Sequence, residues 1–512
     1  MNIPFINAIR SYLQGDGAAI LPEMELVLFG LGILLIDFWI ERKEKYWNAG
    51  LALAGTIFSA FTIWKLRGAV VARGDFAGFH DAVLVDPFFL FFATLFLAAT
   101  ALVILLSVQY LEFEQEQEGE YYALLLFACV GMMLMASGVD LIVMFLGLET
   151  MALSFYVLTG FLRREKRSNE AALKYVLLGA FSSGILAYGF SLLYGMSDST
   201  NIGRIGMMLG RRNDFVQSLA RGPQPATAHF DPVVLQLLPI LAFVLVAVGL
   251  FFKVAAVPFH QWAPDVYEGA PTPVSAYVSV ASKTASFALL LRLFFSVFAV
   301  SRDTWIPLVA GVAVASLTWG NLAALTQTNV KRLLAYSSIS HVGFILLALV
   351  ASNETAFTGI AYYLLSYVFM TAGAFAVIIV LRQKGLIGEE LEDLNGLYQR
   401  SPAAAVLLLI FMLSLAGIPP TAGFMCKYFI FLSLIETHHP VLAVFAVLYI
   451  VPALYYYFRI VVHAWLKQPG EAPRPVMTSA QAVALGVAVF VTLAAGLYPE
   501  PFTRLAQYAF GQ

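Results

Sequence analysis

Residues 252–275 read FKVAAVPFHQWAPDVYEGAPTPVS and follow a strongly apolar run. Lys253 lies five residues before Pro258, where a membrane helix has to break because proline lacks a backbone N–H and clashes with the preceding turn. Residues 416–427 read AGIPPTAGFMCK and again combine a proline break with a nearby lysine, Lys427. Interrupted apolar segments at corresponding positions of two halves are typical of membrane proteins built from internal repeats. These two stretches therefore decide the predicted fold.

The composition places most of the chain in a bilayer. Of 512 residues, 60% are hydrophobic and only 12% are charged, and the mean hydropathy is +0.81. A soluble domain has about 45–50% apolar and about 25% charged residues. Sliding windows of about 19 residues predict an all-α polytopic membrane protein with about 14 transmembrane helices, near residues 22–40, 48–66, 85–108, 120–136, 139–162, 169–195, 232–256, 273–297, 304–325, 332–351, 355–381, 402–434, 438–466 and 478–498.

The two proline breaks fall in predicted helices 7 and 12, which are five helices apart. Each repeat unit therefore has five spans, and because five is odd, the second unit must lie inverted in the membrane. The predicted organisation is an N-terminal three-helix segment (1–119), a first five-helix bundle (120–297), a second, inverted five-helix bundle (304–466) and a C-terminal helix 14 (467–512).

Several chemistries are excluded by the sequence. The formal net charge of −2 offers no basic patch for nucleic acid. Cys129 and Cys426 are the two cysteines and form no CxxC pair, so we expect neither a disulfide framework nor an iron–sulfur cluster. Phosphate-binding, zinc-protease and nucleophile-elbow motifs are missing. We therefore expect no metal, nucleotide or redox centre in this chain.

The basic residues of the loops predict the orientation. Lys and Arg are more frequent in the loops that follow odd-numbered helices, above all in the short loops 41–45 and 163–167. Because loops rich in Lys and Arg stay inside, both termini are expected outside, which in a bacterial inner membrane is the periplasmic face.

Six basic residues fall within the predicted spans. A charge at the centre of a span costs about 2.5–3.5 kcal/mol on insertion scales. Such groups must be paired, hydrated or deprotonated, and they mark function by default. They are Lys174, Lys253, Lys283, Arg292, Lys427 and Arg459.

Two further titratable groups are predicted near the membrane midplane. Glu149 in helix 5 and His341 in helix 10 each lie about ten residues into their helices, about 15 Å deep. We interpret Glu149, Lys253, Lys283, His341 and Lys427 as a chain of proton carriers. A buried lysine can bind and release a proton near neutral pH if a carboxylate approaches it in one state and retreats in another.

Structural alternatives stay open for each residue. Glu149 and Lys253 could form a static buried ion pair, and His341 could simply hydrogen-bond across helices. Lys174 is a further candidate proton carrier, but it lies near its helix start and could instead extend to the interface. Arg292 and Arg459 lie toward helix ends and are interpreted as anchors.

The quoted motifs resemble a known family. Residues 252–275 resemble the signature of the antiporter-like membrane subunits of respiratory complex I, the proton-translocating NADH:quinone oxidoreductase. Residues 265–269, DVYEG, resemble the N-type branch in particular. Residues 173–184, LKYVLLGAFSSG, and 417–424, GIPPTAGF, followed by Lys427, resemble the same family, and the similarity extends over about residues 85–466.

The resemblance implies two inverted five-helix bundles, each forming a half-channel. It assigns the family's glutamate–lysine pair to Glu149 and Lys253, the central relay lysine to Lys283, a relay histidine to His341 and the terminal lysine to Lys427. It also implies partners, namely the antiporter-like subunit M and small membrane subunits such as K and J, with NADH, FMN, iron–sulfur clusters and quinone bound elsewhere in the complex. A multisubunit cation/proton antiporter and a membrane scaffold remain alternatives.

Overall fold

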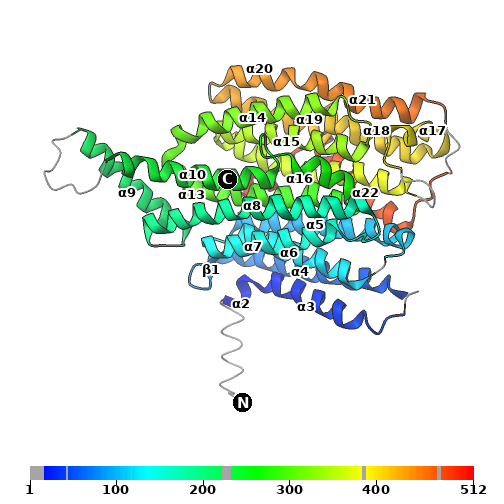
Figure 1. The fold of residues 1–512 in the computed structure, drawn as a ribbon, viewed down its shortest axis with the longest axis horizontal. Helices are drawn as coiled ribbons and strands as arrows, with labels where there is room; N and C mark the ends of the chain where they lie inside the picture. The colour runs from blue at the N-terminus through cyan, green and yellow to red at the C-terminus, as the bar shows by residue number, and fades with distance from the viewer. Residues whose placement is uncertain are drawn as a thin grey trace, which may run out of the picture.

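The computed structural model describes residues 16–41, 44–116, 118–221, 232–382, 388–469 and 474–511. Nearly all of their regular structure is helical. In Figure 1 the long helices lie side by side, with α3 and α4 at one edge of the bundle and α20 and α21 at the opposite edge. The predicted all-α polytopic fold is confirmed. The two chain ends that the orientation prediction concerns lie outside the described residues.

The first half of the chain contains the N-terminal segment and the first predicted bundle. Its elements are α2 (Asp16–Ala19), α3 (Leu21–Ile36), α4 (Trp47–Arg73), β1 (Phe76–Gly78), β2 (Val83–Val85), α5 (Pro87–Glu114), α6 (Gly119–Ser137), α7 (Leu141–Thr159), α8 (Lys166–Ser197), α9 (Ile202–Arg221), α10 (Pro232–Val254), α11 (Trp262–Gly269), α12 (Thr272–Tyr277), the π-helix η2 (Val278–Ser282) and α13 (Lys283–Ser296).

The second half contains the second predicted bundle and the C-terminal helices. Its elements are the 3₁₀ turn η3 (Ala299–Ser301), α14 (Arg302–Ala324), α15 (Val330–Ala351), α16 (Glu354–Leu381), the 3₁₀ turn η4 (Leu391–Leu394), α17 (Leu397–Arg400), α18 (Pro402–Ala416), α19 (Ala422–Glu436), α20 (Pro440–Leu448), α21 (Ile450–Leu466), α22 (Ser479–Leu497) and α23 (Glu500–Tyr508).

Among the described residues, twelve helices are long and apolar enough to cross a membrane. The fourteen predicted spans include two more segments, the 16-residue α3 and the broken pair of α18 and α19, each shorter than a full span. The count of fourteen remains a prediction. The most apolar window of α16 is wholly buried by other helices, so α16 forms the centre of the bundle.

Both predicted helix breaks are present at the predicted positions. α10 ends at Val254, and Ala255 has a φ of +60° before the cis peptide between Val257 and Pro258. α18 ends at Ala416, and Gly417 has a φ of +84° before the cis peptide between Pro419 and Pro420. Each break thus leaves a half-helix whose C-terminal carbonyls lie inside the bundle.

A repeated backbone contact relates the two halves. Asp140 bridges Asn201, and Asn329 bridges Glu390; in each case the two residues are 61 positions apart. Each bridge fixes the start of a helix, because the Asp140 side chain accepts from the first turn of α7 and the Asn329 side chain accepts from the first turn of α15. The two halves therefore begin the corresponding helices in the same way.

The helix pairs next to these bridges also pack in the same register. An ideal Cβ on Gly131 of α6 would lie 2.4 Å from the backbone N of Met151, and one on Gly320 of α14 would lie 2.7 Å from the backbone N of Ser340. Gly131 and Gly320 each lie nine residues before their helix-capping residue. Small residues allow this close approach of helix backbones in a membrane, and both halves use it at the same place.

Three elements differ from the sequence prediction. No span is predicted between residues 196 and 231, but this stretch contains α9, which projects from one end of the bundle in Figure 1. A short antiparallel hairpin pairs Phe76 with Val85 between α4 and α5. A further helix, α23, follows α22. A prediction of membrane spans from hydrophobic windows does not detect elements of these three kinds.

Candidate functional site

Lys253 of α10 and Glu149 of α7 lie within electrostatic range of each other without forming an ion pair. Lys253, in the last turn of α10, is only 4% exposed and interacts electrostatically with the Glu149 carboxylate. No ion pair within 4.0 Å joins them among the described residues, and one Glu149 oxygen, Oε1, is buried without a hydrogen-bond partner. The Lys253 Nζ lies 6.0 Å from the ring centroid of Tyr156. The two groups are therefore near each other but separate, which disagrees with a static buried pair.

An aromatic stack connects α7 and α8 to the start of α11, next to the first break. Tyr156 contacts Tyr175 with ring centroids 4.8 Å apart, and Tyr175 stacks on Trp262 at 4.7 Å with nearly parallel planes. Trp262 donates from its indole to the carbonyl of Phe252 at 2.9 Å, which ties the start of α11 to the end of α10. Gly179 leaves room for the stack, since a Cβ there would lie 2.0 Å from the Tyr156 hydroxyl.

Lys283 connects the first bundle to the second. It directly follows η2, and π-helical turns inside α-helices are frequent at functional sites. Its ammonium donates to the hydroxyl of Ser338 on α15. Ser338 also accepts from the Tyr367 hydroxyl at 2.7 Å, and Tyr367 contacts Ser279 at 3.2 Å. Hydrogen-bonded side chains of the two predicted bundles therefore meet at Lys283.

His341 lies one turn further along α15. Its Nδ1 is 2.6 Å from the Tyr363 hydroxyl and its Nε2 is 3.1 Å from the Tyr457 hydroxyl. Its ring lies 5.3 Å from that of Tyr367, which bonds to the Ser338 partner of Lys283. The histidine is close enough to both Lys283 and Lys427 to interact electrostatically with each of them.

Lys427 closes the second break. It follows the break, in α19, yet its Nζ donates back to the carbonyl of Ala416, the last residue of α18, at 2.6 Å. It also lies 5.2 Å from the ring centroid of Phe344. Lys253 belongs to the last turn of its own half-helix. Both breaks therefore place an ammonium at a half-helix C-terminus, where the helix dipole favours a cation.

Glu149 and His341, predicted at about equal depth, differ by one helical turn when their helices are aligned at the capping residues. Measured from the capping residues Asp140 and Asn329, Glu149 is nine residues into its helix and His341 is twelve. The residue that occupies the position of Glu149 in the second half is Ser338, the acceptor of Lys283. The predicted depths count from the edges of apolar windows, which do not show where each helix is capped.

Lys174 lies outside the buried chain. Its side chain is 43% exposed and pairs with Glu170 at 2.7 Å and with Asp265 at 2.9 Å. Arg332 pairs with Asp265 at 2.7 Å and with Glu268 at 3.0 Å in the same cluster. Lys174 is therefore part of a charged surface cluster rather than of the midplane chain.

Two further ion pairs, both missed by the sequence analysis, lie at the same end of the bundle. Lys331 is buried and donates to Glu389 at 2.9 Å, and Arg382 pairs with Glu114 at 2.7 Å. Their partners are 58 and 268 positions apart, so only the fold brings them together. They join connections that follow odd-numbered predicted helices, which agrees with the predicted alternation of loops between two sides.

The two arginines interpreted as anchors are fixed by oxygen ligands. Arg292 contacts both carboxylate oxygens of Asp86, at 2.9 and 2.8 Å, and donates to the Ala136 carbonyl at 2.6 Å. Arg459 donates to the carbonyl of Leu325 at 2.5 Å. The acceptors of these hydrogen bonds are the Asp86 carboxylate and two backbone carbonyls, and none of them belongs to the chain of lysines.

The described residues can be searched for metal-ligating clusters and for paired cysteines. In the part of the chain that the structure describes, no group of three or more His, Cys, Asp or Glu residues could hold a metal ion. Cys129 and Cys426 are buried and unpaired with each other. What the described site offers is protonatable and hydroxyl-bearing side chains, joined across two helix bundles.

The fold and the buried lysines define an antiporter-like membrane subunit, and comparison with known proteins agrees. A family model described as "NADH:quinone oxidoreductase/Mrp antiporter, TM" matches residues 138–451. The chain belongs to this family. Its relatives include proteins named NADH-quinone oxidoreductase subunit N: one from Solibacter usitatus is 51% identical over 502 residues, 97% of this chain and 98% of that protein, and one from Koribacter versatilis is 50% identical over 505 residues, 97% and 96%.

Solved structures show the same fold. A chain of respiratory complex I from Thermus thermophilus with bound aureothin is 31% identical, with a TM-score of 0.76 over 95% of this chain and 99% of that one. A chain of the Mrp complex from Dietzia is 20% identical, with a TM-score of 0.78 over 96% of each chain, and shows the fold alone. The resemblance stated from the motifs is confirmed.

Proposed function

We propose that this chain is a proton-conducting membrane subunit of an NADH:quinone oxidoreductase. Protons move along Glu149, Lys253, Lys283, His341 and Lys427, and the movement is coupled to quinone reduction in other subunits. The observation that carries the proposal is Lys283: a buried ammonium of the first bundle donates to Ser338 of the second, one turn from His341.

The separation of Glu149 and Lys253 supports a switchable pair. A pair already closed would hold its proton tightly, whereas a carboxylate with a buried, unpartnered oxygen can approach the lysine when the stack of Tyr156 shifts. Approach stabilises the ammonium and retreat favours proton release, and Lys283 is the next carrier. Ser338, Tyr367, Tyr363 and Tyr457 supply the hydroxyls between carriers.

The driving force comes from partners. Moving one charge against 100 mV requires about 2.3 kcal/mol, and we place the electron carriers, NADH, FMN, iron–sulfur clusters and quinone, in other subunits. The partners are the neighbouring antiporter-like subunit M and small subunits such as K and J. The location is the bacterial inner membrane, with both termini on the periplasmic side.

The test is proton transport by assembled complexes carrying Lys253→Ala or Lys427→Ala. We expect proton transport per assembled complex to fall by about tenfold or more, since a positioned proton carrier contributes about 10²–10⁴-fold to transfer rates. Lys174→Ala, in the surface cluster, is the matched control. Undiminished transport in the first two variants contradicts the proposal, and defective assembly with normal transport per complex favours a scaffold.

A cation/proton antiporter is the second candidate, because the matching family model covers antiporter subunits as well. It predicts proton movement that depends on sodium or potassium and proceeds without NADH. Isolation of the native particle separates the two: co-migration with NADH:quinone activity supports the first proposal, and a particle without redox activity favours the second.

A further inference from the structure

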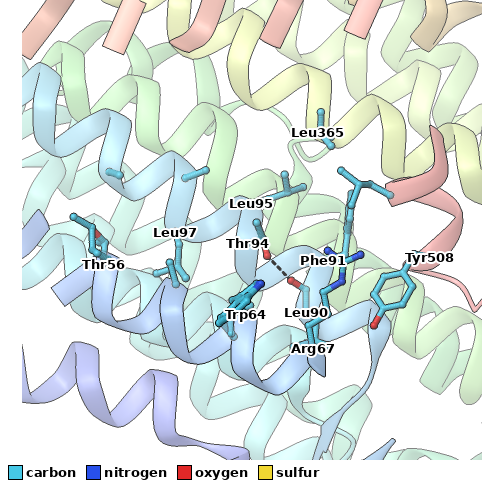
Figure 2. Close-up of a pocket in the computed structure, with 16 residues that line it drawn as sticks. Thr56, Trp64, Arg67, Leu90, Phe91, Thr94, Leu95, Leu97, Leu365 and Tyr508 are labelled. Atoms are coloured by element: carbon cyan, nitrogen blue, oxygen red, sulfur yellow. Dashed lines mark hydrogen bonds between the residues drawn. The ribbon is translucent and has the colours of Figure 1, made fainter. Parts of the chain in front are cut away.

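An apolar groove runs along the outer side of the N-terminal segment. It has a volume of about 430 Å³ and is lined by residues of α4, α5 and α23 and by Leu365 of α16. Figure 2 shows Arg67 and Tyr508 at one end of the groove and Thr56 at the other. Ile57 and Trp64 on its rim are exposed, so the groove opens toward the membrane.

The walls of the groove offer no free hydroxyl from its two threonines. Thr94 donates to the carbonyl of Leu90 at 2.7 Å, as the dashed line in Figure 2 shows, and Thr56 donates to that of Leu53 at 2.8 Å. Each hydroxyl is satisfied by its own helix. The groove therefore suits a hydrocarbon occupant.

The length of the groove matches one leaflet. From Arg67 to Thr56 is eleven residues of α4, about 16 Å at 1.5 Å per residue. The hydrocarbon core of a bilayer is about 30 Å thick. A single acyl chain that starts at the interface near Arg67 thus ends at Thr56, close to the midplane.

A second, polar cavity continues from the arginine end. It shares Arg67, Leu505 and Tyr508 with the groove and adds Arg504 and Glu500 of α23. The Arg67 guanidinium lies 5.1 Å from the Tyr508 ring centroid and has no ion pair among the described residues, whereas Arg504 pairs with Glu500 at 2.5 Å. The polar end of the groove, with Arg67, Arg504 and Glu500, therefore carries a net charge of +1. It lies beside the short surface helix α23.

We propose that this groove binds one anionic phospholipid. An acyl chain fills the apolar part, and the phosphodiester lies between Arg67 and Arg504. Charge complementarity selects the headgroup, because basic side chains at the level of the lipid phosphates attract anionic lipids. Tyr508 and the amphipathic α23 mark the interface level at which that phosphate lies.

The experiment uses the intact complex that contains this chain and phosphatidylglycerol with a photoreactive diazirine in its acyl chain. After illumination, mass spectrometry of the digested chain locates the lipid adduct. We expect the adduct on residues 56–67 or 90–101. Arg67→Gln combined with Arg504→Gln removes two cations, and we expect it to lower the yield at least about fivefold, which is the effect that losing even one cation has near anionic lipid.

Two controls decide the outcome. Lys65→Gln removes a cation from the same helix that does not line the groove, so it should leave the yield unchanged. A phosphatidylcholine probe with the same chain should label the groove several-fold less. Equal labelling by both lipids, an equal loss with Lys65→Gln, or no adduct in the groove because a neighbouring subunit covers it would each overturn the proposal.

Discussion

Glu149 of α7 and Ser338 of α15 occupy the same position in the two halves, nine residues after the capping residues Asp140 and Asn329. Each faces a buried lysine of the first bundle: Glu149 interacts electrostatically with Lys253, and Ser338 accepts from Lys283. A carboxylate that approaches a lysine stabilises its ammonium, and one that retreats favours release of the proton. A hydroxyl is neutral and can only relay a proton between its neighbours. In the proposed proton path, the same position would therefore serve as a switch in one half and as a connection in the other.

Ser338→Ala should interrupt the connection between the bundles. Loss of a hydrogen bond to a buried charge costs about 1–3 kcal/mol, so NADH-driven proton transport should slow by about tenfold. Ser286→Ala is the control, because that buried hydroxyl bonds only to the carbonyl of Ser282 in its own helix. Equal transport rates in the two variants would show that Ser338 carries no proton.

Gly179→Ala should displace Tyr156 and so disturb the Glu149–Lys253 pair. The added Cβ would lie 2.0 Å from the Tyr156 hydroxyl, and overpacking of this kind costs about 1–3 kcal/mol. Gly184→Ala on the same helix is the control, since nothing lies within 4 Å of its Cβ position. Proton transport per assembled complex is the measurement. If Gly179→Ala transports as well as Gly184→Ala, the stack does not position the pair.

Gly131→Ala and Gly320→Ala should destabilise the two repeated helix pairs to a similar extent, about 1–3 kcal/mol each. In both cases the new Cβ meets backbone atoms that cannot move away, of Met151 and Gly147 or of Ser340 and Tyr336. Thermal unfolding of the purified protein is the measurement, and Gly311→Ala, with open space around it, is the control. A large effect at one site alone would contradict equivalent packing.

Lys45 should make stability depend on alkaline pH. Burial alone would lower the pKa of its ammonium, but hydrogen bonds to Glu118 and Asp37 outweigh burial and raise the pKa above the ordinary value of 10.5. A raised pKa means that the contribution is complete below the ordinary lysine pKa and is lost as pH rises through the folded-state value.

The Lys45 contribution can be measured against Lys45→Met. Because the ion pairs are only partly buried, we expect a difference in stability of about 1 kcal/mol or less. Thermal unfolding at neutral pH should show it, and the difference should shrink toward strongly alkaline pH. A difference that grows with pH would contradict the sign.

The spans, the breaks and the lysines are predictable from sequence because their signals are local. Runs of apolar residues mark spans, prolines mark breaks, and a lysine within an apolar run stands out wherever its partner lies. α9 also leaves a local signal, since apolar and basic residues alternate with helical spacing in IGRIGMMLGRR. A prediction of membrane spans alone misses this helix.

The partners were not predictable from the sequence. Ser338 is 55 positions from Lys283, and Tyr457 is 116 positions from His341. A serine or tyrosine in an apolar helix looks the same whether it bonds its own helix, as Ser286 does, or a lysine of another bundle. The register of Glu149 with Ser338 depends on the capping contacts, which become visible only when the fold pairs Asp140 with Asn201 and Asn329 with Glu390.

The most direct test of the central claim is the initial rate of proton uptake into vesicles containing the complex with Lys283→Met, driven by NADH oxidation. The variant has an unbranched side chain of similar length but no amine that could bind a proton. We expect a rate reduced by at least about tenfold, with assembly intact. Lys174→Met, in the surface cluster, should take up protons at close to the rate of the unmodified complex. Uptake at the unmodified rate in Lys283→Met would contradict the claim that protons cross between the bundles at this lysine.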